Sequence, residues 1–287
     1  MKYKLIVFLV ICIAISIIAC EYEEGYIQSP FSQWWQAPMV YDDSGATKSL
    51  NVAAVSFYVD LSPEVNRNKM VALIDKIKNE QPDVRLILFP ETTLGYYDKP
   101  KNSPDYHKSI AETIPGETVN VLSPKAIEHQ IYISFGIIEK SGVDFYNSQV
   151  LIGPDGTILS VHHKNYLTQV EKEFGCKAGN DITVNIVDNI KVATIICKDS
   201  MVFETHKRIH KSGAELVLLP VANLTAHVDH NLRPNHFTYT WLLGANRIGN
   251  EDGIDYEGSV YLMSPSGELK IRSFGKEGYI YGVVKCR

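Results

Sequence analysis

The sequence predicts an α/β fold, more specifically a four-layer α-β-β-α sandwich with mixed sheets. Short apolar runs such as residues 51–57 and 85–89 are typical of strands buried on both faces. Segments with helical spacing alternate with the first three runs, which is the pattern of parallel strands covered by helices. Later runs flank tight turns such as Pro154-Asp155-Gly156, which indicates antiparallel hairpins. Helices are therefore expected only on the outer faces of the two sheets.

The first helix has clear start and stop signals. Ser62 is a favourable N-cap, Pro63 suits the first helical position, and Glu64 places an acid in the first turn. Pro82 marks the end of the helix. Its apolar face is expected to consist of Met70, Leu73, Ile74 and Ile77.

The remaining elements follow from the same signals of periodicity and turns. At 287 residues the chain can bury the core of one large domain. In chain order we expect a helix at 118–129, a strand at 131–138, a hairpin of 146–152 with 157–161, a hairpin of 182–187 with 190–196, a helix at about 201–212, a strand at 215–219 and a last hairpin group from 260 onward.

The N-terminal segment is typical of an export signal. Lys2 and Lys4 precede an uncharged apolar run at 5–19, which is shorter than the roughly 20 residues that span a bilayer. The run ends in Ala19-Cys20, which resembles the bacterial lipoprotein box, where the Cys is lipidated. We expect a lipoprotein signal peptide at 1–19, a membrane tether at 20–49 and a domain at 50–287 outside the cytoplasm. An ordinary cleaved signal peptide and an uncleaved anchor are the alternatives, and both also export the domain.

Composition excludes several partners. The formal net charge is −5, and no stretch interleaves basic and aromatic residues, so no nucleic acid is expected. The five cysteines show no metal-binding spacing, and we expect neither a metal nor another cofactor. The segment His227-Val-Asp229-His230 is interpreted as a solvated loop. A disulfide between Cys176 and Cys286 is left open.

Three segments place a reactive side chain where a predicted strand ends, which is where α/β sheets carry their chemistry. Glu91 follows a core strand and a proline, and a buried carboxylate there requires a partner. Cys197 lies between a strand and a predicted helix, so its thiolate could interact with the helix N-terminus, and the next backbone N–H could face a developing oxyanion. Lys164 lies just past a hairpin strand. Alone, such a Cys is more often an inert apolar residue, and such a Glu is often a helix cap.

Taken in order, these motifs resemble the Glu-Lys-Cys triad of the nitrilase superfamily. The resemblance extends from about residue 51 to the C-terminus and implies the nitrilase type of the expected sandwich. The motifs that carry it are Phe89-Pro90-Glu91, His163-Lys164-x-x-Leu167, Phe174-Gly-Cys-Lys-Ala-Gly179-Asn180, Ile196-Cys197-x-Asp199, Asn246-Arg247-x-Gly249 and Gly258-Ser259.

The resemblance implies a role for each residue of the triad. Glu91 takes the proton of Cys197, the thiolate attacks a carbonyl or nitrile carbon, and Lys164 with the backbone N–H of Lys198 stabilises the negative charge. A further carboxylate supports the lysine. Glu171 fits that role best, and Glu173 is close enough in sequence to compete.

Two departures bear on the substrate. Lys198 stands where relatives commonly have an aromatic residue, and residues 236–244 replace the stretch usual on a helix that forms the pocket wall and a subunit contact. A homo-oligomer is therefore left open. We expect a cysteine-dependent hydrolase of a small linear amide or carbamoyl compound. The alternatives are nitrile hydrolysis and a lipid-anchored binding protein that has lost catalysis.

Overall fold

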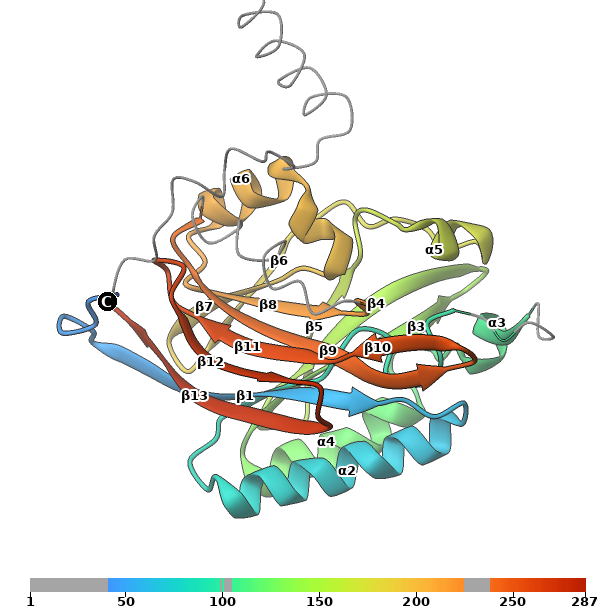
Figure 1. Ribbon diagram of the computed structural model, residues 1–287, viewed down its shortest axis with the longest axis horizontal. Helices are drawn as coiled ribbons and strands as arrows, with labels where there is room; N and C mark the ends of the chain where they lie inside the picture. The colour runs from blue at the N-terminus through green and yellow to red at the C-terminus, as the bar shows by residue number, and fades with distance from the viewer. Residues whose placement is uncertain (1–40, 99, 101–104, 225–237) are drawn as a thin grey trace, which may run out of the picture.

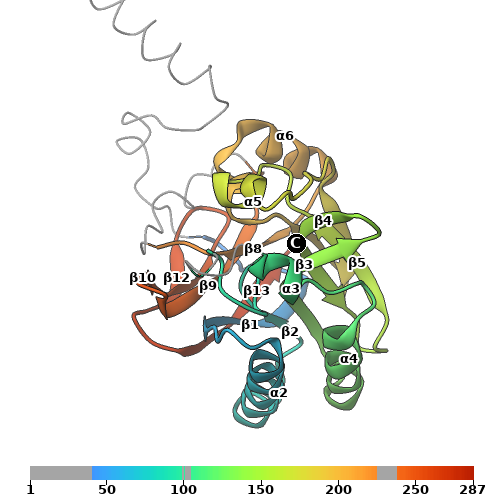
Figure 2. The same cartoon turned by 90° about the vertical axis from the view of Figure 1, so that its right-hand side faces the viewer.

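The predicted four layers are present in the computed structural model, which describes residues 41–98, 100, 105–224 and 238–287. Figure 1 shows α2 and α4 below the strands and α6 above them, and Figure 2 shows α2 and α4 side by side. The helices are α2 (Pro63–Glu80), α3 (Tyr106–Ile110), α4 (Glu117–His129), α5 (Gln169–Glu173) and α6 (Phe203–Ser212). The strands are β1 (Lys48–Tyr58), β2 (Leu86–Leu88), β3 (Tyr132–Ser141), β4 (Asp144–Ile152), β5 (Ile158–His163), β6 (Thr183–Val187), β7 (Ile190–Thr194), β8 (Leu216–Val221), β9 (Trp241–Glu251), β10 (Ile254–Glu257), β11 (Ser259–Met263), β12 (Leu269–Phe274) and β13 (Gly278–Cys286).

Alternation along the strands divides the apolar core into separate layers. Successive side chains of a strand point to opposite faces, so Val52 and Ala54 of β1 pack in an inner core together with Leu216 of β8. Ala53 and Val55 point the other way, into the core between the sheet and the helices α2 and α4. Strands buried on both faces explain why their sequences are continuous apolar runs.

Helix α2 forms where its signals predict it. The hydroxyl of Ser62 accepts a hydrogen bond from the backbone N–H of Val65 at 3.4 Å. Met70, Ile74 and Ile77 are fully buried against the sheet, and each such side chain contributes roughly 1.5–3 kcal/mol. The predicted start, end and apolar face of this helix are confirmed.

The strands follow the order β5-β4-β3-β2-β1-β9-β8-β7-β6. Strand β1 pairs in parallel with β2 and β9 and antiparallel with β13, while β3, β4 and β5 are joined antiparallel. The expected mixture of parallel and antiparallel pairs is therefore confirmed. β1 begins at Lys48, slightly before the predicted domain start at residue 50.

Strand β9 was not predicted. Residues 236–244 were interpreted as the replacement of a helix, but Trp241 to Gly244 begin an eleven-residue strand that pairs in parallel with β8. The strand is buried on both faces as far as Arg247, so its sequence carries no alternation that would distinguish it from a buried helix.

Some predictions fall outside the described residues. These are the signal peptide, Cys20, most of the tether, and the segment from His227 to His230. Within the described ranges, no helix is long and apolar enough to cross a membrane.

Candidate active site

Two carboxylates and one ammonium meet where β2 and β5 end. Nζ of Lys164 lies 2.7 Å from Oε1 of Glu91 and 2.7 Å from Oε1 of Glu171. All three side chains are fully buried, although they come from separate parts of the sequence. The structure thus brings together three of the four residues predicted as catalytic, and the cluster holds one positive charge between two carboxyl groups.

Asn147 of β4 completes this cluster. Its Nδ2 donates to Oε1 of Glu91 at 2.7 Å and also to Oε1 of Glu171. The second carboxylate oxygen of Glu91, Oε2, is buried and accepts no hydrogen bond from the described residues. One oxygen of Glu91 is therefore held in place, while the other has capacity to take a proton.

Burial and charge move the three pKa values apart. Burial raises the pKa of Glu91, the charge of Lys164 partly offsets this, and the charge of Glu171 adds to the rise. For Glu171, burial acts in the same direction, but the charge and hydrogen bond of Lys164 outweigh it and lower the pKa. Burial alone would lower the pKa of Lys164, yet the negative charges around it, Glu91 first, raise it well above the usual value. These directions favour Lys164 as an ammonium with Glu171 as its counter-ion, and they make Glu91 the carboxyl group of the cluster that binds a proton most readily.

Cys197 follows β7 and is partly buried. Its backbone φ is +43°, in the left-handed region that a residue with a side chain rarely adopts. Its Sγ lies 3.5 Å from Oδ1 of Asn223, as expected for a thiol donating to an amide oxygen. Burial raises the pKa of the thiol, the charge of Glu91 raises it further, and Lys164 opposes the rise. Cys197 is therefore within electrostatic reach of Glu91 and Lys164, and the thiol needs a base.

The backbone after Cys197 differs from the prediction in one respect. A short 3₁₀ helix, Cys197–Met201, follows the cysteine, and the α-helix starts only at Phe203. The reason is local: the carboxylate of Asp199 accepts the N–H of Ile196 at 3.0 Å and draws the chain into a tight turn.

Asp199 also joins this turn to the loop that carries Lys164. Its Oδ1 accepts the backbone N–H groups of Asn165 at 3.0 Å and Tyr166 at 2.8 Å. Nε2 of His162 lies 3.4 Å from Oδ2. Because Asp199 is fully buried, this one carboxylate fixes the Lys164 and Cys197 loops relative to each other.

Two further residues were candidates for the site, Glu173 and Lys198. Glu173 is exposed and accepts a hydrogen bond from Gln169 at 3.1 Å, so the carboxylate that contacts Lys164 is Glu171. Nζ of Lys198 lies 3.3 Å from the carbonyl oxygen of Leu167. The oxyanion role of the Lys198 backbone N–H stays a prediction.

The other two cysteines of the described domain are free thiols. Cys176 and Cys286 are both buried and unpaired with each other. The Cys176 backbone N–H donates to the carbonyl oxygen of Glu171 at 2.9 Å, which places this thiol beside the cluster. Burial raises the pKa of Cys176 and that of Cys286, the latter to about 12, so both thiols stay protonated near neutral pH.

Sequence reasoning missed Tyr97, Asn147 and Asn223. Tyr97 lies with its ring 5.7 Å from Nζ of Lys164, and its hydroxyl is 2.7 Å from Oγ1 of Thr168. Neither an isolated Tyr after a turn nor a single Asn in a strand stands out from its neighbours. Only Asn223, which lies just after β8, could have been identified by its position after a strand end.

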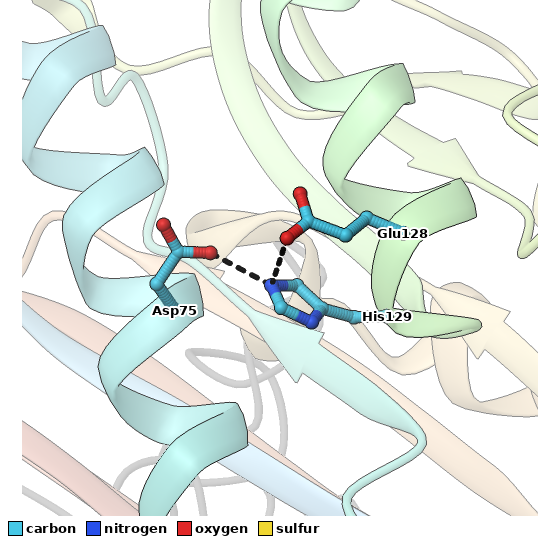
Figure 3. A group of neighbouring side chains, drawn as sticks. All are labelled: Asp75, Glu128 and His129. Atoms are coloured by element: carbon cyan, nitrogen blue, oxygen red, sulfur yellow. Dashed lines mark hydrogen bonds and ion pairs between the residues drawn. The ribbon is translucent and has the colours of Figure 1, made fainter.

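One group of side chains on the helices, Asp75, Glu128 and His129, has the residue types and spacing of metal ligands. Figure 3 shows Asp75 of α2 beside Glu128 and His129 of α4. Nζ of Lys125 lies 2.8 Å from the same oxygen of Asp75 that Nε2 of His129 contacts at 2.7 Å. A cation is thus already supplied by Lys125, and this group is a helix-to-helix ion pair.

The chain is similar in sequence and in fold to known proteins of one family. The family model of the carbon-nitrogen hydrolases matches residues 51–285. A nitrilase of Pyrococcus abyssi is 29% identical over 73% of this chain and 79% of its own length. An omega-amidase of Xenopus laevis is 30% identical over 62% of this chain and 66% of its own length. A carbon-nitrogen hydrolase superfamily protein of Xanthomonas campestris shares the fold with a TM-score of 0.73, at 16% identity, over 83% of this chain and 91% of that one.

The chain therefore belongs to the carbon-nitrogen hydrolase family, which confirms the resemblance and the fold expected from the sequence. Within that family it is a cysteine-dependent hydrolase.

Proposed function

We propose that the protein hydrolyses a small linear amide or carbamoyl compound to an acid and ammonia or an amine, with Cys197 as nucleophile. The observation that carries this is the buried cluster in which Lys164 holds Oε1 of Glu91 at 2.7 Å while Oε2 accepts no hydrogen bond from the described residues. A base with one fixed oxygen and one available oxygen, within electrostatic reach of a thiol, suits proton transfer.

The first half of the reaction forms a thioester. Glu91 takes the proton of Cys197, and the sulfur adds to the carbonyl carbon of the substrate. Lys164 and the backbone N–H of Lys198 stabilise the negative charge that forms on the carbonyl oxygen. The carbon–nitrogen bond then breaks, and Glu91 returns its proton to the departing nitrogen, which leaves as ammonia or an amine.

The second half consumes one water molecule. Glu91, again a carboxylate, takes a proton from the water, whose oxygen adds to the thioester carbon. The carbon–sulfur bond breaks, the acid is released, and the sulfur recovers a proton from Glu91. The raised pKa of Glu91, caused mainly by burial, suits a group that must take and give a proton in each half.

The names of similar proteins favour an amide. They include an omega-amidase and an (R)-stereoselective amidase, whereas another similar protein is named a nitrilase. The nitrile is the alternative substrate, and product analysis with a matched amide and nitrile distinguishes the two.

Replacing Cys197 tests the proposal. Cys197→Ala should abolish release of ammonia from amides while the thermal unfolding of the protein stays cooperative. The assay is an ammonia-release screen over amides, carbamoyl amines and nitriles, in which Cys176→Ala serves as the matched control and keeps activity. Turnover by Cys197→Ala at the wild-type rate would refute the assignment. An electrophilic amide analogue should form a covalent adduct with the wild type at Cys197, detected by intact mass. Such an adduct would argue against the alternative that the protein only binds its ligand and has lost catalysis.

We also propose that the domain acts outside the cytoplasm, anchored by a lipid on Cys20. The apolar run at 5–19 that ends in Ala19-Cys20 supports this. Cys20→Ser should release the protein from the membrane fraction, with Cys12→Ser as control. A Cys20→Ser protein that stays fully bound would contradict lipidation at this position.

A further inference from the structure

Strand β9 lies between the two parts of the sheet that carry the reacting groups. On one side it pairs with β1, with Asn246 opposite Ser56, and on the other with β8, with Asn246 opposite Val221. The loops bearing Glu91 and Lys164 follow strands on the β1 side. Cys197 follows β7, on the β8 side. The separation of Glu91 from Cys197 therefore spans β9, which Figure 1 shows at the centre of the molecule.

Asn246 contacts the chain segment beside the thiol. Its Oδ1 accepts the backbone N–H of Asn223 at 3.0 Å, and its Nδ2 donates to the carbonyl oxygen of Asn223 at 3.2 Å. Oδ1 of Asn223 lies 3.5 Å from Sγ of Cys197. The backbone N–H of Ala222 hydrogen-bonds to the same sulfur, which favours the thiolate. Asn246 thus holds the backbone of Asn223, the residue whose side-chain oxygen lies beside the sulfur.

Arg247 contacts the loop that carries the base. Its Nη1 donates to the carbonyl oxygens of Glu91 at 3.1 Å and Thr92 at 2.7 Å, and to Oγ1 of Thr92 at 2.7 Å. Its Nη2 donates to the carbonyl oxygen of Gly95 at 2.7 Å, and its Nε donates to Glu251 at 2.7 Å. Arg247 is fully buried, so these acceptors replace the water that its charge would otherwise bind.

Asn246 and Arg247 are adjacent in the strand, so their side chains leave opposite faces of it. The side chain of Asn246 contacts Asn223, beside Cys197, and that of Arg247 contacts the loop of Glu91. Both are anchored in a strand that pairs with each half.

We propose that Asn246 and Arg247 are positioning residues that together set the separation between the Glu91 carboxylate and the Cys197 thiol. The proposal rests on the proposed function, in which Glu91 takes the proton of that thiol. Such a transfer requires the two atoms at about 2.6–3.2 Å or one bridging water. A misplacement of about 1 Å lowers a rate by roughly 100-fold.

The test uses Asn246→Ala and Asn246→Ser, with Asn250→Ala as the matched control. Asn250 lies in the same strand but is exposed and bonds Asp255. Two experiments are done on each variant. The first measures kcat and KM for the amide found in the screen. The second measures how the alkylation of Cys197 by iodoacetamide depends on pH, with peptide mapping to identify the modified residue, and it requires no substrate.

For Asn246→Ala we expect kcat on the order of 100-fold lower with KM changed by less than about threefold. The alkylation curve should also change, because the segment of Asn223 beside the sulfur is no longer held by Asn246. Asn246→Ser keeps a group that can accept from Asn223 and should lie between Ala and the wild type. Asn250→Ala should behave as the wild type.

Arg247→Lys tests the other half. A lysine keeps the positive charge beside Glu251 but cannot reach four acceptors at once, so kcat should fall by a similar factor. The alkylation curve should also change, since Glu91 is displaced from the thiol. Because this variant removes buried hydrogen bonds, thermal unfolding is recorded for every protein, and rates are referred to the folded fraction.

Three results would overturn the proposal. They are an unchanged kcat and alkylation curve in folded Asn246→Ala, a raised KM with normal kcat, and an equal loss in Asn250→Ala. Failure of the proposed function gives a different result, because Cys197→Ala would then retain turnover while the alkylation curves of the Asn246 variants still report on the spacing.

Discussion

Two clusters of the molecule contain the same kinds of groups in different surroundings. Glu91, Lys164 and Glu171 meet at 2.7 Å in the candidate active site, with all three side chains fully buried. On the helical side, Lys125 lies 2.8 Å from Asp75 and 2.9 Å from Glu128. The lengths of the contacts are nearly equal, but the side chains of Asp75 and Glu128 are 37% and 56% exposed.

The comparison shows that burial, and not the contact itself, makes a charge pair reactive. Water screens the exposed cluster, whose pairs contribute at most about 1 kcal/mol. Water does not screen the buried cluster in this way, so each charge strongly shifts the pKa values of its neighbours. The pKa of Glu91 is raised and that of Glu171 is lowered. Each of the following changes tests one side of this contrast.

The largest effect is expected from Lys164→Met. Removal of the ammonium leaves two carboxyl groups facing each other without their cation. The free energy of unfolding should fall by about 3–5 kcal/mol. In the proposed mechanism this ammonium stabilises the oxyanion, so kcat/KM should fall by about 100- to 1,000-fold. Urea denaturation and the amide assay measure the two effects, and a variant with more than a tenth of wild-type activity would contradict the role of Lys164.

A smaller effect is expected from Glu171→Gln, with Glu173→Gln as its control. Glu171 does not touch the reacting atoms in the proposed mechanism, but it holds Lys164 in place. We expect kcat/KM to fall by about 10- to 100-fold for Glu171→Gln. Glu173 is exposed, and its replacement should leave the rate unchanged. Equal losses in the two variants would show that the structure assigns the wrong supporting carboxylate.

The pH dependence of activity follows from the pKa of Glu91. Burial raises that pKa, so the inactive protonated form persists above the usual value of about 4.3. Activity should therefore decline with falling pH before an ordinary glutamate would be protonated. The charge of Glu171 contributes to the rise, so Glu171→Gln should move the acid limb of the kcat/KM profile to lower pH. A limb that stays in place, or moves upward, would disprove the coupling.

The smallest effect is expected in the exposed cluster. Lys125→Met removes the ammonium between Asp75 and Glu128, and the free energy of unfolding should change by less than about 1 kcal/mol. Activity should stay at the wild-type level. Raising the salt concentration should reduce the small effect further. A loss of several kcal/mol would remove the contrast between the two clusters.

Local signals accounted for much of the fold. The start of α2 could be predicted because Ser62 and Pro63 act on their own helix, and the hairpin turn at Gly156 needs only its neighbours. Strand β9 could not, because the partners that make it a strand, β1 and β8, are distant in sequence. Its two buried faces leave no periodicity to detect.

The candidate site divides in the same way. Glu91, Lys164 and Cys197 were identified because a charged or nucleophilic residue after an apolar run is unusual. Asn147 and Asn246 act through hydrogen bonds to residues 23 to 56 positions away, and an isolated Asn in a sequence gives no sign of such a partner. Physical pairing across the sheet, and not local propensity, selects these residues.

The left-handed backbone of Cys197 has a consequence for the durability of the protein. A side chain held at a φ of +43° costs about 1–3 kcal/mol, which the surrounding turn must supply. A glycine would relieve this strain, but it carries no sulfur. At position 197, the residue that would give the more stable fold therefore differs from the residue that the proposed mechanism requires.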